Sequence, residues 1–169
     1  MTPFFNTKLY NRENAVNYAI QWALQRNPQY YDYSGLGGDC TNFASQVIYS
    51  GTGVMNYTPI YGWYYKTGNE KSPSWTGVNY LSEFLINNQG QGPFTEEVAM
   101  PDLQQGDLIQ LSFVNPQHFN HSLLITKLEQ PITSDNIYVA THSPNFLHRK
   151  LSSYQWIAIR FIHIKGVNV

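Results

Sequence analysis

The pattern of apolar and polar residues divides the chain into a helical first half and a strand-forming second half. Apolar residues recur with the period of an α-helix in residues 11–26, 40–50 and 76–87. From Gly106 onward, apolar and polar residues alternate instead, which predicts strands over residues 107–113, 121–127, 136–141 and 156–164. Helices followed by an antiparallel meander indicate an α+β fold, in which the sheet packs on the helix that starts at residue 40.

Residues 51–75 show no sustained period and are rich in glycine, proline and aromatic rings. A loop of this length in a compact domain is usually a binding or lid element. In that interpretation Trp63, Tyr65 and Trp75 form the wall of a substrate site. The alternative is a loop that packs its own rings over the core as a cover. In both cases we expect one domain, residues 1–169, with this aromatic loop as an insertion.

Composition narrows the classes of partner. The 169 residues are 42% hydrophobic, enough for one domain with a core of its own. Ten basic and eleven acidic residues give a net charge of -1 without a basic stripe, so we expect no nucleic-acid partner. Only 12% of residues are charged, whereas thirteen are tyrosines, and such a surface suits sugars and peptides. We expect a monomer.

The sequence leaves the cellular compartment open. No apolar run approaches the ~20 residues of a membrane-spanning helix, so we expect no membrane span. The first residues, Met1–Asn6, lack the basic flank and apolar centre of a signal peptide. If a signal was removed from a longer chain, the protein is secreted or associated with the cell wall; otherwise it is cytoplasmic. The single cysteine excludes an internal disulfide without fixing the compartment.

The only cysteine, Cys40, lies at the predicted start of a helix, directly after the candidate N-cap Asp39. Free N–H groups and the positive end of the helix dipole stabilise a thiolate there, so we expect a lowered thiol pKa and a nucleophile. The backbone N–H of Cys40 and the hydroxyl of Tyr33 are candidate donors to an oxyanion. The alternative is that Cys40 is a small buried hydrophobic residue.

Two histidines are candidate partners of this cysteine. A hairpin loop centred between Pro131 and Ile132 places His121 and His142 opposite one another on the same face of two paired strands. His121 would then act as general base, oriented by His142, with Asn145 as the alternative orienting residue.

A zinc site formed by Cys40, His121 and His142 is a further alternative. Its ligand types are acceptable, but the sequence lacks the Cys-x-x-Cys or His-Glu-x-x-His spacing that would favour it. We therefore expect neither a metal ion nor a cofactor.

Several motifs carry a resemblance to a known family: Tyr10-Asn11-Arg12-Glu13-Asn14-Ala15-Val16, Gly38-Asp39-Cys40-Thr41-Asn42-Phe43-Ala44-Ser45-Gln46, Trp75-Thr76-Gly77-Val78, Gly106-Asp107-Leu108-Ile109 and Asn120-His121-Ser122. From Tyr10 to about Leu151 the chain resembles the bacterial putative amidase domain family. That family belongs to the papain-like superfamily, together with NlpC-type and CHAP-type cell-wall hydrolases.

The resemblance implies a papain-like, NlpC-type fold with Cys40 as nucleophile, His121 as base and His142 as the orienting residue. It implies a cysteine amidase or peptidase that acts on an amide bond, with peptidoglycan stem peptides or another peptide as substrate. The chain departs from the family pattern after Thr141-His142-Ser143-Pro144-Asn145, where no further acidic or hydroxyl residue follows. The alternative function is a catalytically inactive module of the same fold that binds a glycan or a peptide.

Overall fold

The structure is a computed structural model that describes residues 4–169. The segment considered above as a signal peptide, Met1–Asn6, therefore lies partly outside the described residues. Four α-helices occur in the described residues: α1 (Arg12–Trp22), α2 (Cys40–Thr52), α3 (Pro73–Thr76) and α4 (Val78–Asn87). Three short 3-10 helices are η1 (Met100–Asp102), η2 (Ser134–Asn136) and η3 (Leu151–Ser153). None of the helices in this part of the chain has the length and apolar character needed to cross a membrane.

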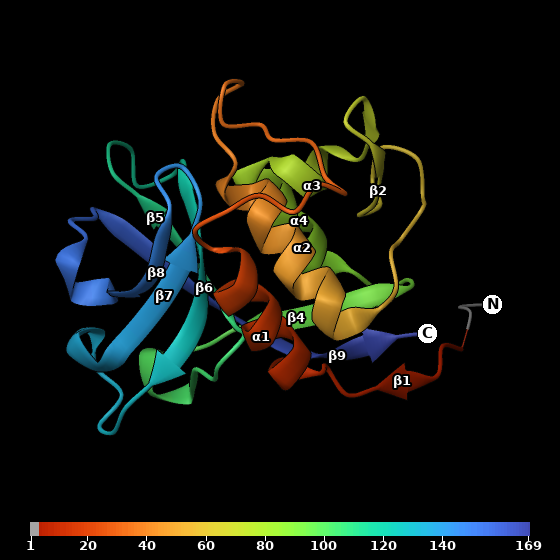
Figure 1. Ribbon diagram of the computed structural model, residues 1–169. Helices are drawn as coiled ribbons and strands as arrows, with labels where there is room; N and C mark the ends of the chain where they lie inside the picture. The colour runs from red at the N-terminus through yellow and green to blue at the C-terminus, as the bar shows by residue number, and fades with distance from the viewer. Residues whose placement is uncertain (1–3) are drawn as a thin grey trace.

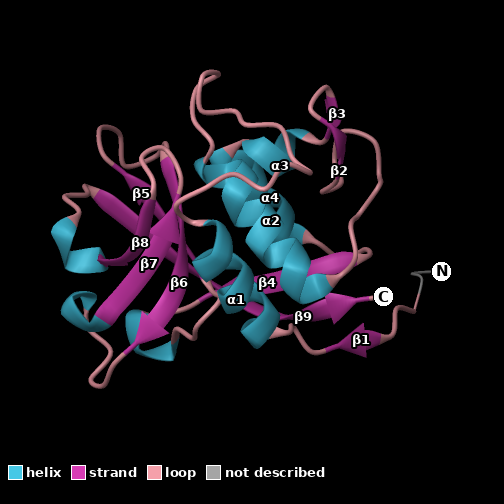
Figure 2. Ribbon diagram, in the orientation of Figure 1, coloured by secondary structure: helices cyan, strands magenta, loops and turns pink. Residues whose placement is uncertain are grey.

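The main sheet is antiparallel and has the order β1-β9-β5-β6-β7-β8, with β4 also paired to the long strand β9 (Figure 2). Its strands are β1 (Thr7–Lys8), β4 (Gly92–Glu97), β5 (Leu108–Ser112), β6 (His121–Leu128), β7 (Ile137–Thr141), β8 (Phe146–Lys150) and β9 (Ala158–Asn168). A small separate hairpin consists of β2 (Tyr65–Thr67) and β3 (Glu70–Lys71). The four predicted strands correspond to β5, β6, β7 and β9. The last of them pairs with β5 and does not follow β7 in a meander, where β8 lies instead.

The sheet has an apolar core on each face. On one face, helices α1, α2 and α4 cover the strands (Figure 1). Leu108, Leu124 and Ala140 of the sheet belong to the same apolar cluster as buried residues of these helices. On the other face, η1 and the segment around η3 cover a second cluster that includes Leu111 and Leu123. Successive residues of a strand point to opposite faces of the sheet. The cluster that a strand residue contacts therefore shows which face its side chain occupies.

The α+β class is confirmed, whereas the papain-like relationship stays a prediction. The predicted helix over residues 76–87 is α4, which begins at Val78 after the extended residue Gly77, and the short helix α3 lies mostly within the predicted loop. The helix that begins at Cys40 ends at Thr52, and Gly53 adopts the left-handed conformation that terminates many helices. Strands β4 and β8 were not predicted, because neither segment shows a clean alternation of apolar and polar residues.

The aromatic loop is a cover for the core. The indoles of Trp63 and Trp75 are fully buried, with ring centroids 5.0 Å apart. Their Nε1 atoms donate to Ser45 Oγ and Asn42 Oδ1 of α2, both at 3.0 Å. The expectation that these two rings form a substrate wall is therefore wrong, because no solvent reaches them.

Tyr65 belongs to the same cover. Its ring lies 5.8 Å from that of Trp75, and its hydroxyl accepts a hydrogen bond from the backbone N–H of Tyr31 at 2.8 Å. The half-buried ring thus fixes the loop around Tyr31. This packing gives Tyr65 a structural role in place of the expected binding role.

Candidate active site

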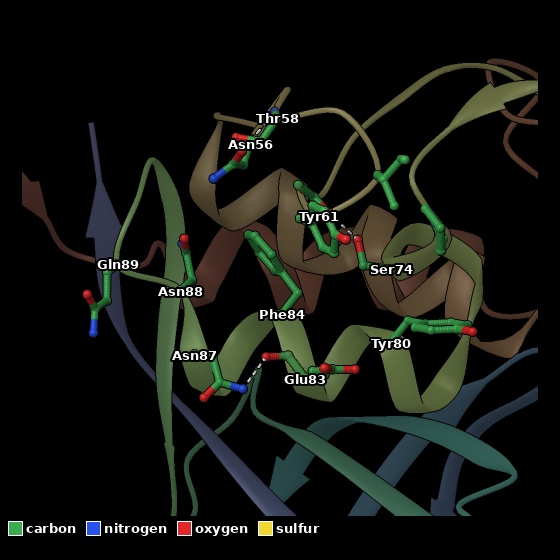
Figure 3. Close-up of a pocket in the computed structure, with 13 residues that line it drawn as sticks. Asn56, Thr58, Tyr61, Ser74, Tyr80, Glu83, Phe84, Asn87, Asn88 and Gln89 are labelled. Carbon is green, nitrogen blue, oxygen red and sulfur yellow. Dashed lines mark hydrogen bonds between the residues drawn. The ribbon is translucent and has the colours of Figure 1, made fainter.

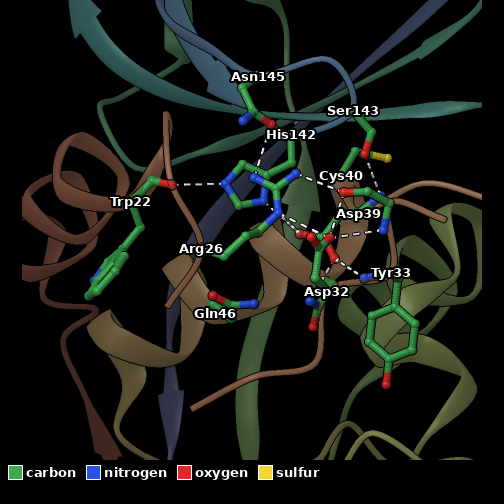
Figure 4. Close-up of polar contacts among 12 residues, drawn as sticks. Trp22, Arg26, Asp32, Tyr33, Asp39, Cys40, Gln46, His142, Ser143 and Asn145 are labelled. Carbon is green, nitrogen blue, oxygen red and sulfur yellow. Dashed lines mark hydrogen bonds and ion pairs between the residues drawn. The ribbon is translucent and has the colours of Figure 1, made fainter. Parts of the chain in front are cut away.

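The segment before α2 is held by the buried carboxylate of Asp39. As predicted, Asp39 is the N-cap residue, but its side chain makes no capping hydrogen bond to the helix backbone. Instead Oδ1 accepts from the backbone N–H of Tyr33 at 2.8 Å and from Asn42 Nδ2 at 2.9 Å (Figure 4). Gly37 and Gly38, with φ of 95° and 114°, allow the chain to turn into the helix.

Cys40 is the first residue of α2, and its side chain lies against the start of β6. Its Sγ is 3.7 Å from Thr41 Oγ1, which in turn is 3.0 Å from Ser122 Oγ. The residue is only 8% exposed. Burial raises the pKa of the Cys40 thiol, although contacts with Ser122 and Thr41 act in the opposite direction. The expected lowering of this pKa is therefore wrong, and the resting group is a neutral thiol.

His121 is the first residue of β6, directly before the Ser122 that contacts the α2 terminus. Its ring is 7% exposed and lies between the rings of Phe113 and Tyr154, with centroid distances of 6.2 and 6.1 Å. Burial, assisted by the charge of Arg149, lowers the His121 pKa to about 4, so the ring is neutral near pH 7. His121 pairs with Leu111, so its ring lies on the face of Leu111 and Leu123, opposite the face that α2 covers. Within residues 4–169 it makes no hydrogen bond with Cys40 Sγ.

Thr141, the last residue of β7, fixes the tautomer of His121. Its Oγ1 is 3.3 Å from His121 Nε2 and 2.9 Å from the carbonyl oxygen of Ser122. The carbonyl of Ser122 can only accept and is the nearest acceptor, the carbonyl of His142 lying at 3.2 Å, so we assign the single hydroxyl hydrogen to Ser122 and a lone pair to the ring. In this assignment Nε2 carries the ring hydrogen, which leaves Nδ1 as a proton acceptor.

The predicted pairing of His121 with His142 is wrong by one residue. Leu124 pairs with Ala140, where the predicted register pairs it with Val139, and an irregularity follows between Ile125 and Lys127. Because a shift of one residue exchanges the faces of a strand, His142 points to the helices. Thr141 takes the place beside His121 that was expected for His142.

Both ring nitrogens of His142 instead form hydrogen bonds with groups other than His121. Its Nδ1 is 2.6 Å from Asp39 Oδ2, its Nε2 is 2.8 Å from the carbonyl oxygen of Trp22, and its ring stacks on Phe43 at 4.1 Å. Figure 4 shows the sulfur of Cys40 turned away from this imidazole. His142 therefore neither orients His121 nor joins it in a zinc site. Two acceptors, Asp39 Oδ2 and the carbonyl oxygen of Trp22, thus flank the ring.

Two further candidates are engaged elsewhere. Asn145 Oδ1 accepts from Arg26 Nη1 at 3.0 Å, so Asn145 does not orient His121. The hydroxyl of Tyr33 donates to the carbonyl oxygen of Gly68 at 2.7 Å, and burial raises the Tyr33 pKa to about 12. Its ring points away from Cys40 in Figure 4, so it is not an oxyanion donor. The backbone N–H of Cys40 has no hydrogen-bond partner within residues 4–169 and stays a candidate.

Sequence reasoning missed Thr141 and the anchoring role of Asp39. The signal for Thr141 was present, because the alternation in residues 136–141 is compatible with either of two registers. One of these registers places Thr141 on the face of His121. For Asp39, nothing in the local pattern distinguishes a buried anion from an ordinary N-cap.

The most evident groove of the described residues lies elsewhere, along α4 and the aromatic loop (Figure 3). It has a volume of about 600 Å³, and the exposed rings of Tyr61 and Tyr80 contribute to its lining. The amide nitrogens of Asn56 and Asn88 are already bonded to backbone carbonyls within the same loops. None of Cys40, His121 and Thr141 lines this groove.

Comparisons with known proteins agree with the resemblance that the sequence motifs indicate. The family whose description is "Putative amidase domain" matches residues 9–164. The chain is 30% identical over 134 residues to "Uncharacterized protein YhbB" of Bacillus subtilis (strain 168). That alignment covers 76% of this chain and 42% of the relative, so the chain spans under half of the relative's length. No solved structure matches.

The neutral state of His121 predicts a specific loss of stability in acid. The unfolded ring has a pKa near 6.5 and the folded ring about 4, so the unfolded chain binds the proton first as the pH falls. This single group should lower the free energy of unfolding by about 2 kcal/mol between pH 7 and pH 5. Urea denaturation of the wild type and of His121→Gln at both pH values measures this difference. An equal loss in the two proteins would contradict a neutral, buried His121.

The Asp39–His142 pair predicts strong energetic coupling. Removing one partner leaves the other buried without this hydrogen bond, although Asp39 keeps Arg26 at 3.6 Å, so Asp39→Ala and His142→Ala should each cost about 1–3 kcal/mol of stability. The double variant should lose clearly less than the sum of the two. Chemical denaturation of the four proteins gives the coupling free energy. The exposed pair of Lys66 and Glu70, at 2.6 Å, is the matched control and should show no measurable coupling.

Proposed function

The chain belongs to the putative amidase domain family, which indicates amide hydrolysis, and from that premise we propose that Cys40 is the nucleophile of a cysteine amidase or peptidase. One observation carries the proposal. The first residue of α2 combines a thiol with a backbone N–H that has no partner within residues 4–169, and it lies beside the start of β6, whose first residue is His121. The reaction requires the His121 ring, which contacts Thr141 in the structure, to turn toward Cys40. Nucleophile and oxyanion donor are thus supplied by α2, and the base by the neighbouring strand β6.

The reaction begins from a neutral thiol and a neutral imidazole. Cys40 Sγ attacks the carbonyl carbon of the amide while His121 Nδ1 takes the thiol proton. The carbonyl oxygen becomes negative and accepts a hydrogen bond from the Cys40 N–H, helped by the positive end of α2. The C–N bond then breaks, His121 returns the proton to the leaving amine, and a thioester remains on Cys40.

Water completes the cycle by the same route. His121 Nδ1 takes a proton from the water as its oxygen attacks the thioester carbonyl. The C–S bond breaks, the proton returns to sulfur, and a carboxylic acid leaves. Thr141 is a positioning residue in this scheme, because it touches only the base and holds the ring in the tautomer that each step requires.

We propose peptidoglycan stem peptides as the substrate class. The support is the resemblance of the motifs around Cys40 and His121 to cell-wall hydrolases of the papain-like superfamily. A surface with few charges and many tyrosines also suits a peptide or glycan polymer. The alternative, a catalytically inactive binding module, is favoured by the low exposure of Cys40 and by the separate groove along α4.

The direct test is release of amines from purified cell-wall sacculi. Wild-type protein should release new amino groups, measured by amine labelling and mass spectrometry of the soluble products. Cys40→Ser and His121→Ala should each lower the rate by at least about 10³-fold, because nucleophile and base act as one unit. His118→Ala is the matched control, since His118 is exposed and its ring is hydrogen-bonded to Asn79, away from Cys40 and His121.

The outcomes separate the two candidate functions. Unchanged turnover in Cys40→Ser would exclude a thiol mechanism. If the wild type releases no amine from mildly acidic to alkaline pH, yet both wild type and Cys40→Ser bind sacculi equally well, the inactive binding module is the better description.

The role of Thr141 predicts a graded series of variants. Thr141→Ser keeps the hydroxyl that accepts from His121 Nε2, so its kcat should stay within a few-fold of the wild type. Thr141→Val has nearly the same shape without the acceptor, and its kcat should fall by about 10- to 100-fold at similar KM. Steady-state kinetics on the released peptide measures both. Equal kcat values for the two variants would assign Thr141 a packing role only.

A further inference from the structure

Arg149 on β8 has a guanidinium that is held in place without a charged partner. Its Cζ lies 4.2 Å from the ring centroid of Phe146 and 3.8 Å from that of Tyr154, so the cation contacts two aromatic rings. Nε donates to Ser153 Oγ at 2.7 Å and Nη2 to Ser153 O at 3.2 Å. These contacts fix the group and leave several of its five N–H donors unused.

No carboxylate of residues 4–169 lies within ion-pair distance of Arg149. By contrast, Arg12 pairs with Asp107 at 2.7 Å and Arg26 with Asp32 at 3.1 Å. A partly buried arginine normally takes a carboxylate as its partner, often through two parallel hydrogen bonds. Arg149 is thus an ordered cation that lacks the anion its geometry fits.

The cation lies beside the proposed general base. Tyr154 contacts both groups, because its ring is 6.1 Å from the ring of His121 and 3.8 Å from Arg149 Cζ. The two groups are therefore separated by at most the sum of these distances. An extended peptide covers that span in about three residues, at roughly 3.3–3.6 Å per residue. The charge of Arg149 also helps to lower the His121 pKa, in agreement with this proximity.

We propose that Arg149 binds a carboxylate of the substrate that lies within about three residues of the amide that is cut. The inference rests on the proposed function and adds a substrate class to it, namely acidic peptides. Two sources supply this chemistry in a stem peptide: the carboxylate at the C-terminus and the free carboxylate of a glutamyl residue. Arg149 is then the specificity residue of the site.

The test uses three versions of one synthetic stem tetrapeptide, Ala-Glu-Lys-Ala with a γ-linked D-glutamyl residue. The first has both carboxylates free, the second has the C-terminus as an amide, and the third has the glutamyl carboxylate as an amide. Hydrolysis is measured as kcat/KM by amine release. Binding is measured separately by calorimetry with the Cys40→Ala chain, which cannot turn the peptides over.

For the wild type, kcat/KM should be about 10- to 100-fold higher for the peptide with both carboxylates than for one of the two amidated peptides. The amidated peptide that is disfavoured shows which carboxylate binds Arg149. Arg149→Gln should abolish that preference, so that kcat/KM becomes equal for the two peptides. Arg149→Lys should retain part of the preference, because it keeps the charge without the planar fork. Lys150→Gln is the matched control, since it removes the next, exposed charge of β8 and should leave the preference intact.

The calorimetric binding measurement and the hydrolysis measurement test the carboxylate site at Arg149 and the amidase activity separately. Equal activity on all three peptides would overturn the role of Arg149 and leave the amidase in place. A binding preference that Arg149→Gln abolishes, without hydrolysis of any peptide, would support Arg149 and count against the amidase. Neither hydrolysis nor preference would overturn the carboxylate site. A loss of folded structure in Arg149→Gln is detected by circular dichroism, and the Arg149→Lys result then decides.

Discussion

The buried carboxylate of Asp39 is the interaction on which the arrangement of the site depends. It accepts hydrogen bonds from the loop at Tyr33 and the first turn of α2 at Asn42, and it pairs with His142 at the end of β7. His142 carries the connection on to the carbonyl of Trp22 at the end of α1. Because Cys40 follows Asp39 directly, fixing this carboxylate fixes the nucleophile against the sheet. A buried carboxylate is costly without such partners, so the contacts form together.

The elements that sequence periodicity predicted are those whose signal is local. The face of α1 and the alternation of β5 to β7 can be read from neighbouring residues, and the structure contains them. The pairing of His121 and His142 depended on register, which the hairpin loop and the irregularity after Ile125 determine. No residue near either histidine carries that information. The prediction therefore placed His121 on the correct strand but gave it the wrong neighbour. Because the register differs by one residue, Thr141 lies where His142 was expected.

Burial is the property that the sequence predicted least well. It changed the conclusions about the aromatic wall and about the pKa of Cys40. Trp63 and Trp75 find their hydrogen-bond partners on α2, 18 and 33 residues away, which composition alone cannot show. For Cys40 the helix dipole contributes about 0.3–1 kcal/mol, less than one pKa unit, whereas burial can shift a pKa by several units. Burial therefore determines the direction of the Cys40 shift, although the residue stands where the motif predicted it.

The neutral state of the resting site has a consequence for how a substrate would be used. The ring of His121 contacts the neutral hydroxyl of Thr141, and the charge of Arg149 helps to lower its pKa, so no anionic group among these contacts stabilises an imidazolium. During attack the ring must accept a proton, and in the proposed complex a substrate carboxylate would then sit on Arg149 and offset its charge. Binding of the acidic substrate would thus make His121 more basic at the step that requires it. Since that interaction is stronger once the ring is charged, it favours the transition state over the bound ground state, as catalysis requires.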